Sequence, residues 1–308
     1  MIHYYKTLSG FIYKKDNCDK GTWVNCMSPD DSEISFLSER FKIDVNFLKS
    51  SLDEEESSRV DSDGGIVLIV VDIPIELKND KMFTYYTTPL SIFVTEENVI
   101  TISLQGNEIT NSFASGRVRN SDTNDVANFV LNIILFTSSK YLKYLNKIIK
   151  SSNRIERSLR KSMKNNELIQ LLEIKKSLVY FSSSLKTTKA TLEKLLRGRL
   201  LNKDKSDKEL MDDVLIEIKQ AIEMTDTYMN IISGTMEAFS SIIANNLNVV
   251  MKILASITLI ISIPTVISGI YGMNTPEFPM MKFWWFPIVL SIACMAIAFK
   301  ILKDKDMI

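Results

Sequence analysis

Apolar residues are spread unevenly along the 308-residue chain and are densest near its end. Residues 253–271 and 283–299 contain no charged side chain, and their lengths of about 19 and about 17 residues approach what a helix needs to cross a bilayer. Apolar positions surround both segments instead of forming one stripe, which is typical of membrane helices. We therefore predict two transmembrane helices, and an extracytoplasmic loop at residues 272–282.

Lysines flank the two apolar segments on their outer sides. Lys252 precedes the first segment, and Lys300, Lys303 and Lys305 follow the second in a basic tail at residues 300–308. An excess of lysine beside membrane helices marks the cytoplasmic side. The first residues of the chain lack the apolar core and cleavage site of a signal peptide. We therefore expect a multi-pass protein of the cell (plasma or inner) membrane, with both termini and the long N-terminal part in the cytoplasm.

The pattern of residues 1–120 alternates between strands and helices. Runs rich in Val, Ile, Thr and Tyr predict strands at residues 65–75, 84–95 and 98–104. Apolar residues between positions 32 and 52 recur at helical spacing. The polar and glycine residues of 61–65 predict a turn. We predict a cytosolic α/β domain over residues 1–120.

Helical periodicity dominates from residue 121 onward. A polar break at residues 164–166 predicts two antiparallel cytosolic helices within residues 121–205. From Ser206 the apolar residues recur at intervals of three, four or seven, and no proline appears before Pro264. This favours a stalk helix at residues 206–252 that continues into the apolar segment 253–271, about 100 Å in all at 1.5 Å per residue. A helix of that length needs partners along it.

The composition excludes several classes of protein. Lys and Arg number 37 and balance 37 Asp and Glu, so no bulk charge favours a nucleic acid as partner. One histidine and three scattered cysteines offer little for His-based catalysis or a zinc site. We expect no enzymatic activity and no nucleic-acid binding.

Small and hydroxylated residues form a stripe in the first apolar segment. Ala255, Thr258, Ser262, Thr265 and Gly269 are spaced by three and four residues, and the same spacing extends back to Met251 and Asn248. If several copies of this helix formed a ring, the stripe would line a pore. Small residues also let membrane helices pack closely. Periodicity alone leaves both interpretations open.

The sequence Tyr271–Gly272–Met273–Asn274, between two terminal apolar segments and after NVVMKIL (residues 248–254) and a long helix, resembles the CorA magnesium-transporter family of two-span metal ion transporters. The resemblance implies an α+β membrane protein that assembles as a homopentameric funnel. Five stalk helices would continue into five pore-lining helices, with residues 283–299 forming an outer ring in the lipid bilayer.

The resemblance also implies the ion and its path. The expected function is Mg²⁺ influx driven by the membrane potential, with Co²⁺ or Ni²⁺ as further ions. A selectivity filter of Gly272, Met273 and Asn274 would bind the hydrated divalent cation through its water molecules, because Mg²⁺ releases water reluctantly. The residues implied to line the pore are Asn248, Met251, Leu254, Thr258, Ser262 and Thr265.

Family members are gated by cytosolic Mg²⁺ bound between neighbouring subunits, and the resemblance implies a regulatory metal site here too. Asp213 stands at the matching place on the stalk. The second acid is expected near the end of the helix before the first long strand, where this chain has Lys49–Ser50 in place of the family's aspartate. Asp53 or Glu54 could replace it, or the acidic residues 53–56 could form a solvated turn.

Two other functions remain open from the sequence. A Zn²⁺ transporter could have the same fold, although the pore residues include no His or Cys, the usual zinc ligands. A membrane-anchored coiled-coil scaffold or sensor would use the stalk only to oligomerise. It would leave the Gly-Met-Asn loop unexplained.

Overall fold

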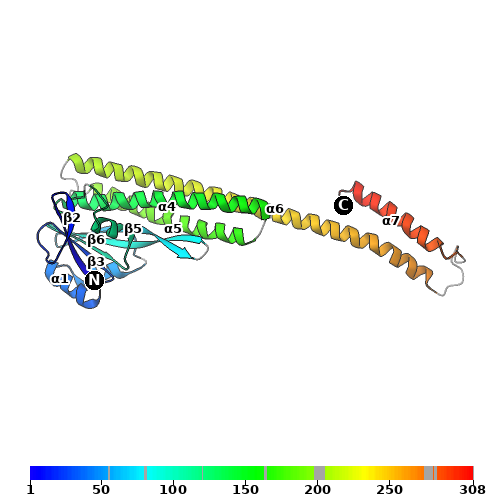
Figure 1. The fold of residues 1–308 in the computed structure, drawn as a ribbon, viewed down its shortest axis with the longest axis horizontal. Coiled ribbons are helices and arrows are strands. Elements are labelled where there is room, and N and C mark those ends of the chain that lie inside the picture. The colour runs from blue at the N-terminus through cyan, green and yellow to red at the C-terminus, as the bar shows by residue number, and fades with distance from the viewer. Residues whose placement is uncertain are drawn as a thin grey trace. The chain divides into compact units, whose positions relative to one another are not determined.

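The computed structural model describes residues 1–54, 56–79, 82–119, 121–162, 165–197, 205–273, 280 and 283–307. The chain divides into two compact units, Met1–Thr235 and Met236–Ile308. The elements of each unit are labelled in Figure 1.

The first unit is built on one seven-stranded sheet, in the order β2-β1-β3-β7-β6-β5-β4. Strands β3 and β7 pair in parallel, and the other neighbouring strands pair antiparallel. The longest pair, β5 and β6, runs in register from Val67↔Val94 to Asn79↔Met82. The strands are β1 (Ile2–Leu8), β2 (Phe11–Lys15), β3 (Thr22–Met27), β4 (Arg59–Asp63), β5 (Ile66–Asn79), β6 (Met82–Val94) and β7 (Val99–Ser103).

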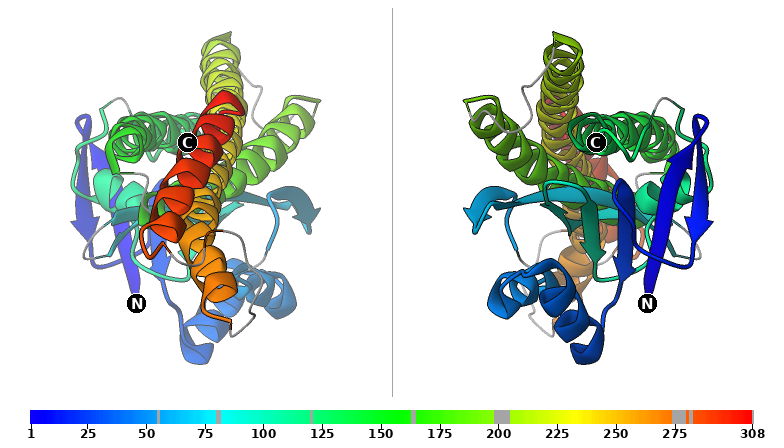
Figure 2. Two further views of the ribbon diagram at one scale, coloured as in Figure 1. Left: turned by 90° about the vertical axis from the view of Figure 1, so that its right-hand side faces the viewer. Right: turned by 90° about the vertical axis from the view of Figure 1, so that its left-hand side faces the viewer.

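Two apolar cores form on the two faces of this sheet. Along β5, Val67, Ile69 and Val71 enter one core, while Leu68 and Val70 alternate with them into the other. The first core is completed by helices α3 (Glu108–Ala114), α4 (Val126–Ser162), α5 (Asn165–Arg197) and the start of α6. The second is covered by α1 (Asp31–Phe41), α2 (Val45–Lys49) and the 3₁₀ turn η1 (Ser50–Leu52). Figure 2 shows α1 on one side of the sheet and α4 and α5 on the other.

Helices α4 and α5 run antiparallel, as the sequence predicts (Figure 1). Aromatic side chains join them to the sheet. The ring of Tyr141 on α4 lies 4.9 Å from that of Phe181 on α5, and Tyr85 on β6 lies 6.0 Å from the same Phe181 ring. All three side chains are buried.

The strands expected at residues 65–75, 84–95 and 98–104 are confirmed as β5, β6 and β7. The turn expected at residues 61–65 is wrong for its first three residues, because Asp61–Asp63 pair with β5 as part of β4. Only Gly64 and Gly65 turn the chain, with φ of 55° and 86°, values that favour glycine. Strands β1 and β2 were not predicted.

Helix α6 (Lys205–Tyr271) has 67 residues and contains Pro264, which confirms the continuous helix expected from residue 206. Helix α7 (Phe286–Asp304) follows in the second unit. It begins three residues later than the apolar segment 283–299 suggested, with Pro287 in its first turn, a position that proline tolerates.

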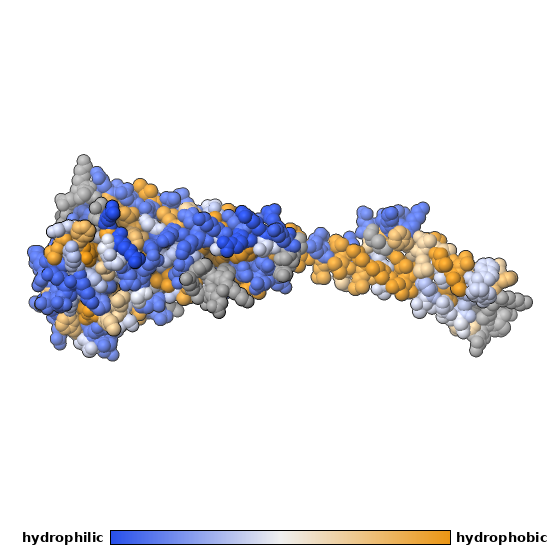
Figure 3. Space-filling model, in the orientation of Figure 1, coloured by the Kyte–Doolittle hydropathy of each residue, from blue (hydrophilic) through white to orange (hydrophobic). Residues whose placement is uncertain are grey.

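Two helices are long and apolar enough to cross a membrane, α6 from Asp207 and α7. Only 6% and 11% of their most apolar stretches are buried, unlike the core helices of a soluble protein. Figure 3 shows this apolar surface over α7 and the end of α6. The expectation of two membrane helices agrees with this exposure.

Candidate ion pathway

The residues expected to line a pore are exposed along α6. Met251 and Leu254 each keep 56% of their surface accessible. Asn248, Thr258, Ser262 and Thr265 are exposed as well. Along α6 this exposed face presents a carboxamide, then apolar side chains, then hydroxyls. It could line an ion path only if other chains enclosed it.

The hydroxyl groups of this face are held by the helix itself. The Oγ1 of Thr258 donates to the Leu254 carbonyl oxygen at 2.8 Å, and the Oγ of Ser262 donates to that of Thr258 at 2.7 Å. Thr265 donates to Ile261 at 3.4 Å. Each hydroxyl proton is thereby occupied, so the free lone pairs of the oxygen can accept from water. The hydroxyls therefore offer acceptors, which suit the water shell of a cation.

The same spacing of three and four residues continues along α6 from Asp213 to Gly272. Every position in this series is exposed, and we call the series the polar stripe. In the first unit it includes Asp213 and Glu223, and in the second it includes Glu237. The stripe predicted from the sequence ends at Asn248 and omits both glutamates, although the same spacing includes them. The positions are 213, 216, 220, 223, 227, 230, 234, 237, 241, 244, 248, 251, 255, 258, 262, 265, 269 and 272.

Another side of α6 packs against the C-terminal segment within the second unit. The Oγ of Ser256, which is only 1% exposed, donates to the carbonyl oxygen of Met307 at 3.2 Å. The ring of Tyr271 lies 6.0 Å from that of Phe286 on α7. These contacts lie off the polar stripe, which therefore stays accessible while the two helices are paired.

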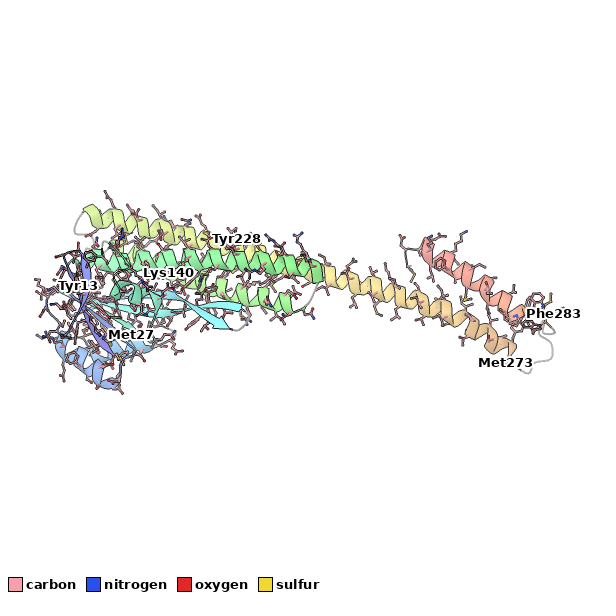
Figure 4. The ribbon with its side chains drawn as sticks, in the orientation of Figure 1. Tyr13, Met27, Lys140, Tyr228, Met273 and Phe283 are labelled. Carbon is pink, nitrogen blue, oxygen red and sulfur yellow. The ribbon has the colours of Figure 1, made fainter. Side chains whose placement is uncertain are left out.

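Gly272 and Met273 continue the last turn of α6. The Gly272 N–H donates to the Ser268 carbonyl oxygen at 2.9 Å, and that of Met273 donates to Ile270 at 3.3 Å. A Cβ atom at position 272 would lie 3.0 Å from the Ser268 oxygen, which is tight for any residue but glycine. Figure 4 places Met273 at the end of α6 and Phe283 shortly before α7. Asn274, the third residue of the expected filter, lies outside the described residues.

The residues beside the expected regulatory acids pack on opposite faces of the sheet. Asp213 is exposed on α6 beside Val214, which belongs to the core on one face of the sheet. Leu52, just before Asp53, packs against the core on the other face.

Glu54 lines a pocket of about 270 Å³. Oxygen-bearing side chains surround it, and the Nε2 of Gln105 donates to the hydroxyl of Tyr86 at 2.5 Å. Hard oxygen donors of this type suit Mg²⁺ better than Zn²⁺. The other lining residues are Tyr86, Thr87, Thr88, Leu104 and Gln105.

The described part of the chain holds no group of three or more His, Cys, Asp or Glu residues placed to bind a metal ion. Cys18, Cys26 and Cys294 are free thiols. Burial is the main cause that raises the pKa of Cys26 to about 12, so this thiol stays protonated at neutral pH. These cysteines therefore give no support to a thiolate zinc site.

Comparison with known proteins identifies relatives over nearly the whole chain. The family model described as "CorA-like Mg2+ transporter protein" matches residues 19–303. The Cobalt/magnesium transport protein CorA of Methanocaldococcus jannaschii is 29% identical over 279 residues, which cover 85% of this chain and 84% of the relative. The Magnesium transport protein CorA of Campylobacter jejuni is 22% identical over 297 residues, 92% of this chain and 89% of the relative.

Solved structures share the fold. The complete CorA magnesium transporter of M. jannaschii superposes with a TM-score of 0.80 at 24% identity, covering 98% of this chain and 95% of that chain. The ZntB cytoplasmic domain of Vibrio parahaemolyticus gives a TM-score of 0.59 at 13% identity, over 80% of this chain and 97% of that chain. Both likenesses concern the fold alone.

The shared fold includes the α/β unit, the long helix and the apolar C-terminal helix, and the family consists of transporters and not of enzymes. Because the family model covers residues 19–303 of 308, this chain belongs to the CorA-like Mg²⁺ transporter family.

Proposed function

We propose that the protein is a homopentameric channel that admits hydrated Mg²⁺ to the cytoplasm down the membrane potential. It would lie in the cell membrane with both termini in the cytoplasm. The curated relatives are named for magnesium, or for cobalt and magnesium. Co²⁺ is therefore a second candidate ion, and Ni²⁺ a third. The observation that carries the proposal is the exposed polar stripe of α6.

A single chain cannot enclose a path for water, because only two of its described helices are suited to cross a membrane. Copies of α6 arranged around an axis would cover the stripe and turn it into the wall of a pore. Closed rotational symmetry is the usual form of such assemblies. The number five comes from the family resemblance.

The order of residues along the stripe fits a path for a hydrated cation. Met251 on the stripe and Leu254 beside it would form an apolar constriction that conducts only when it is wetted. Thr258, Ser262 and Thr265 would accept hydrogen bonds from the ion's water shell. On the cytoplasmic side, rings of Glu237 and Glu223 carboxylates would stabilise divalent cations.

The Gly-Met-Asn loop would select the ion at the outer mouth. Five Asn274 carboxamides and the Gly272 carbonyls offer neutral oxygens, which can bind the water shell of Mg²⁺ without removing it. A ring of carboxylates there would hold a divalent ion too tightly for rapid passage. The Gly272 backbone is suited to this role because no side chain crowds it.

The driving force would be electrical. Moving a divalent ion through 100 mV is worth about 4.6 kcal/mol. Proton-coupled transporters carry acidic residues within their spans, and residues 253–271 and 283–299 contain none.

Cytosolic Mg²⁺ would close the channel by bridging neighbouring chains. Asp213 of one chain would share the ion with Asp53 or Glu54 of the next, since the residues beside these acids, Val214 and Leu52, pack on opposite faces of the sheet within one chain. A Mg²⁺ bridge that forms only in the closed channel shifts the equilibrium between the open and closed channel toward the closed state.

Zn²⁺ transport is the alternative within the same fold. The ZntB domain likeness at 13% identity concerns the fold alone, and the described pore residues are oxygen or apolar groups. A scaffold without transport is disfavoured by membership in a transporter family.

The test is uptake of Mg²⁺ and of Zn²⁺ into liposomes that carry the purified protein, with and without an inside-negative potential. We expect Mg²⁺ uptake that rises with the potential and falls when Mg²⁺ is loaded inside. Zn²⁺ uptake that exceeds Mg²⁺ uptake would favour the alternative, and uptake of neither ion would contradict both.

A further inference from the structure

The second half of α4 carries an unusual concentration of positive charge. Residues 143–161 include seven lysines and arginines and a single acid, Glu156, although the whole chain has 37 residues of each sign. Six of these cations recur at intervals of four and three residues, which places them on one face of the helix. We call this face the basic stripe. Its residues are Lys143, Lys147, Lys150, Arg154, Arg157 and Lys161.

The basic stripe faces away from the packed side of α4. Ile148, Ser152, Ile155 and Leu159 are buried, and at 3.6 residues per turn they project from the side of the helix opposite the stripe. Every residue of the stripe is exposed except Lys147, which is partly buried. Figure 3 shows the hydrophilic surface over this part of α4. Within one chain the stripe is therefore accessible to a partner.

Most of the charge on the stripe is not neutralised within the chain. Lys147 pairs with Glu76 on β5 at 2.7 Å. In the part of the chain that the structure describes, the other five cations of the stripe form no ion pair. Glu156 lies off the stripe and pairs with Arg160 at 2.8 Å. A row of cations without acidic partners creates a positive potential that attracts an anionic surface.

Contacts with α6 show at which end of the first unit the stripe lies. The hydroxyl of Ser139 donates to the Oε2 of Glu217 on α6 at 2.6 Å. Earlier residues of both helices, among them Val130 and Val214, share one core. The two helices therefore run in the same direction. The C-terminal end of α4 lies at the end of the first unit where α6 leaves it (Figure 1).

This end of the first unit is also the one connected to the predicted membrane segment. Residues 236–252 continue α6 for about 26 Å before residues 253–271 begin. A connection this short keeps the stripe at a high effective concentration near the bilayer surface. The cytoplasmic leaflet contains anionic phospholipids, whose negative surface potential attracts lysines and arginines close to a membrane helix. Charge and connectivity thus favour the same partner.

We propose that the basic stripe of α4 docks on anionic phospholipid headgroups of the cytoplasmic leaflet. Arg154, Arg157 and Lys161 make the main contacts, because they lie nearest the end of α4 at Ser162. The two guanidinium groups can bind phosphate oxygens in a bidentate way. Lys143 lies about 27 Å before Lys161 along the helix and contributes only long-range attraction. The inference goes beyond ion transport and uses only the membrane location of the protein.

Chemical labelling of lysines in the full-length protein tests the docking without any transport assay. The protein is reconstituted in nanodiscs of phosphatidylcholine alone, or of equal parts of phosphatidylcholine and phosphatidylglycerol. The readout is the rate at which an amine-reactive reagent acetylates each lysine, measured by mass spectrometry. We expect the rate at Lys161 to fall by about fivefold in the anionic nanodiscs, with a smaller fall at Lys150 and the smallest at Lys143. Lys14, which is exposed on β2, should react equally in both.

Salt should weaken the docking. Raising the ionic strength from about 0.15 M to about 1 M shortens the Debye length from about 8 Å to about 3 Å. The labelling rate of Lys161 in the anionic nanodiscs should then approach its rate in phosphatidylcholine.

Three double variants separate the stripe from positive charge in general. Arg154→Gln with Arg157→Gln should remove most of the protection of Lys161, because two of the charges that bind the lipid are gone. Arg154→Lys with Arg157→Lys should keep the protection, since the charge is retained. Arg117→Gln with Arg119→Gln is the matched control, because both arginines are exposed in the segment before α4, and it should follow the wild type.

Equal labelling of Lys161 in both kinds of nanodisc would overturn the inference. If labelling were equally slow in detergent as well, the stripe would instead be covered by a neighbouring chain. Equal loss of protection in the Arg154/Arg157 glutamine variant and in the control would also overturn it, since net charge alone would then explain the effect. None of these measurements involves ion flux, so a failure of the docking is distinguishable from a failure of the proposed channel.

Discussion

Asp212 and Asp213 are both exposed on α6, but only Asp213 belongs to the polar stripe. This pair offers a control matched in charge, exposure and position. If Asp213 holds regulatory Mg²⁺ between chains, only its loss should weaken closure.

We predict that Asp213→Ala raises Mg²⁺ uptake several-fold when internal Mg²⁺ is high, and that Asp212→Ala leaves uptake unchanged. Removal of one carboxylate ligand lowers the affinity of the closed state for the cation. Uptake into liposomes preloaded with Mg²⁺ measures the effect. Equal uptake by both variants and the wild type would remove Asp213 from the gate.

Leu254 provides a second test at the scale of one residue. A threonine there would make the constriction easier to wet, so we predict that Leu254→Thr raises the resting leak of Mg²⁺ by about tenfold, a loss of about 1.4 kcal/mol from the barrier. Leu254 borders the stripe between Met251 and Thr258, and Ile253→Thr is the control, because Ile253 is also exposed but lies on the opposite side of α6 from the stripe. A leak of equal size in both variants would contradict the assignment of Leu254 to the pore.

Some residues of the candidate site can be identified from the sequence alone, and others cannot. The Gly-Met-Asn motif and the stripe residues can be found from local order and spacing. Asp72 could be noticed as an acid in an apolar run, but Ser58 and Tyr141, whose hydroxyls bind its backbone, are distant in sequence. Only the fold brings these hydroxyls to the Asp72 backbone, so these contacts could not have been predicted.

At the scale of elements, one cluster joins α3 to α4. The Nζ of Lys140 binds the carboxylate of Glu108, and the hydroxyl of Tyr144 donates to its Oε2 at 2.8 Å. Lys140 also lies 5.2 Å from the ring centre of Phe136. Burial acts to raise the pKa of Glu108, but the hydrogen bonds from Lys140 and Tyr144 outweigh it and lower the pKa.

We predict that Lys140→Met destabilises the first unit by about 1–2 kcal/mol at neutral pH, because Glu108 is half exposed and water screens the pair. A lowered pKa contributes stability that is present above the ordinary 4.5 and lost as pH falls through the folded value. The variant should therefore lose less stability on acidification than the wild type. Denaturant unfolding at several pH values measures this, and parallel pH profiles would contradict it.

Element prediction succeeded where the pattern was local and failed at the edges of the sheet. Strands β5, β6 and β7 are apolar runs bounded by turn residues, so their composition identifies them. Strand β4 is charged and becomes a strand only by pairing with β5, as edge strands often do. Its polar residues were therefore mistaken for a turn.

At the scale of the whole molecule, assembly should place the stripes of neighbouring chains near one another. In a background without Cys18, Cys26 and Cys294, we predict that Ser262→Cys forms disulfides between chains and that Ile257→Cys, at an exposed position on the other side of α6, forms few. Pore-lining residues of adjacent copies converge on the axis, whereas residues on the other side of α6 do not. Non-reducing electrophoresis after mild oxidation measures the difference, and equal cross-linking at both positions would contradict a pore at the stripe.

The arrangement of the chain into an α/β unit, a long helix and two apolar segments could be predicted from periodicity alone. The number and arrangement of the subunits could not be predicted in this way, because a single chain shows only the exposed stripe and not the symmetry of the assembly. The division of the chain into cytosolic, stalk, membrane-spanning and loop segments stays a prediction, because the position of the membrane along the chain is itself a prediction. The filter residue Asn274 lies outside the described residues, and its role in selecting the ion stays a prediction.

In the proposed channel, the Gly-Met-Asn loop selects hydrated Mg²⁺ for a potential-driven pore. Mg²⁺ uptake into liposomes with an inside-negative potential, compared between the wild type, Asn274→Ala and the exposed control Asn166→Ala, tests it most directly. We predict that Asn274→Ala abolishes uptake while the oligomer stays intact, and that Asn166→Ala matches the wild type. Undiminished, Mg²⁺-selective uptake by Asn274→Ala would contradict the account.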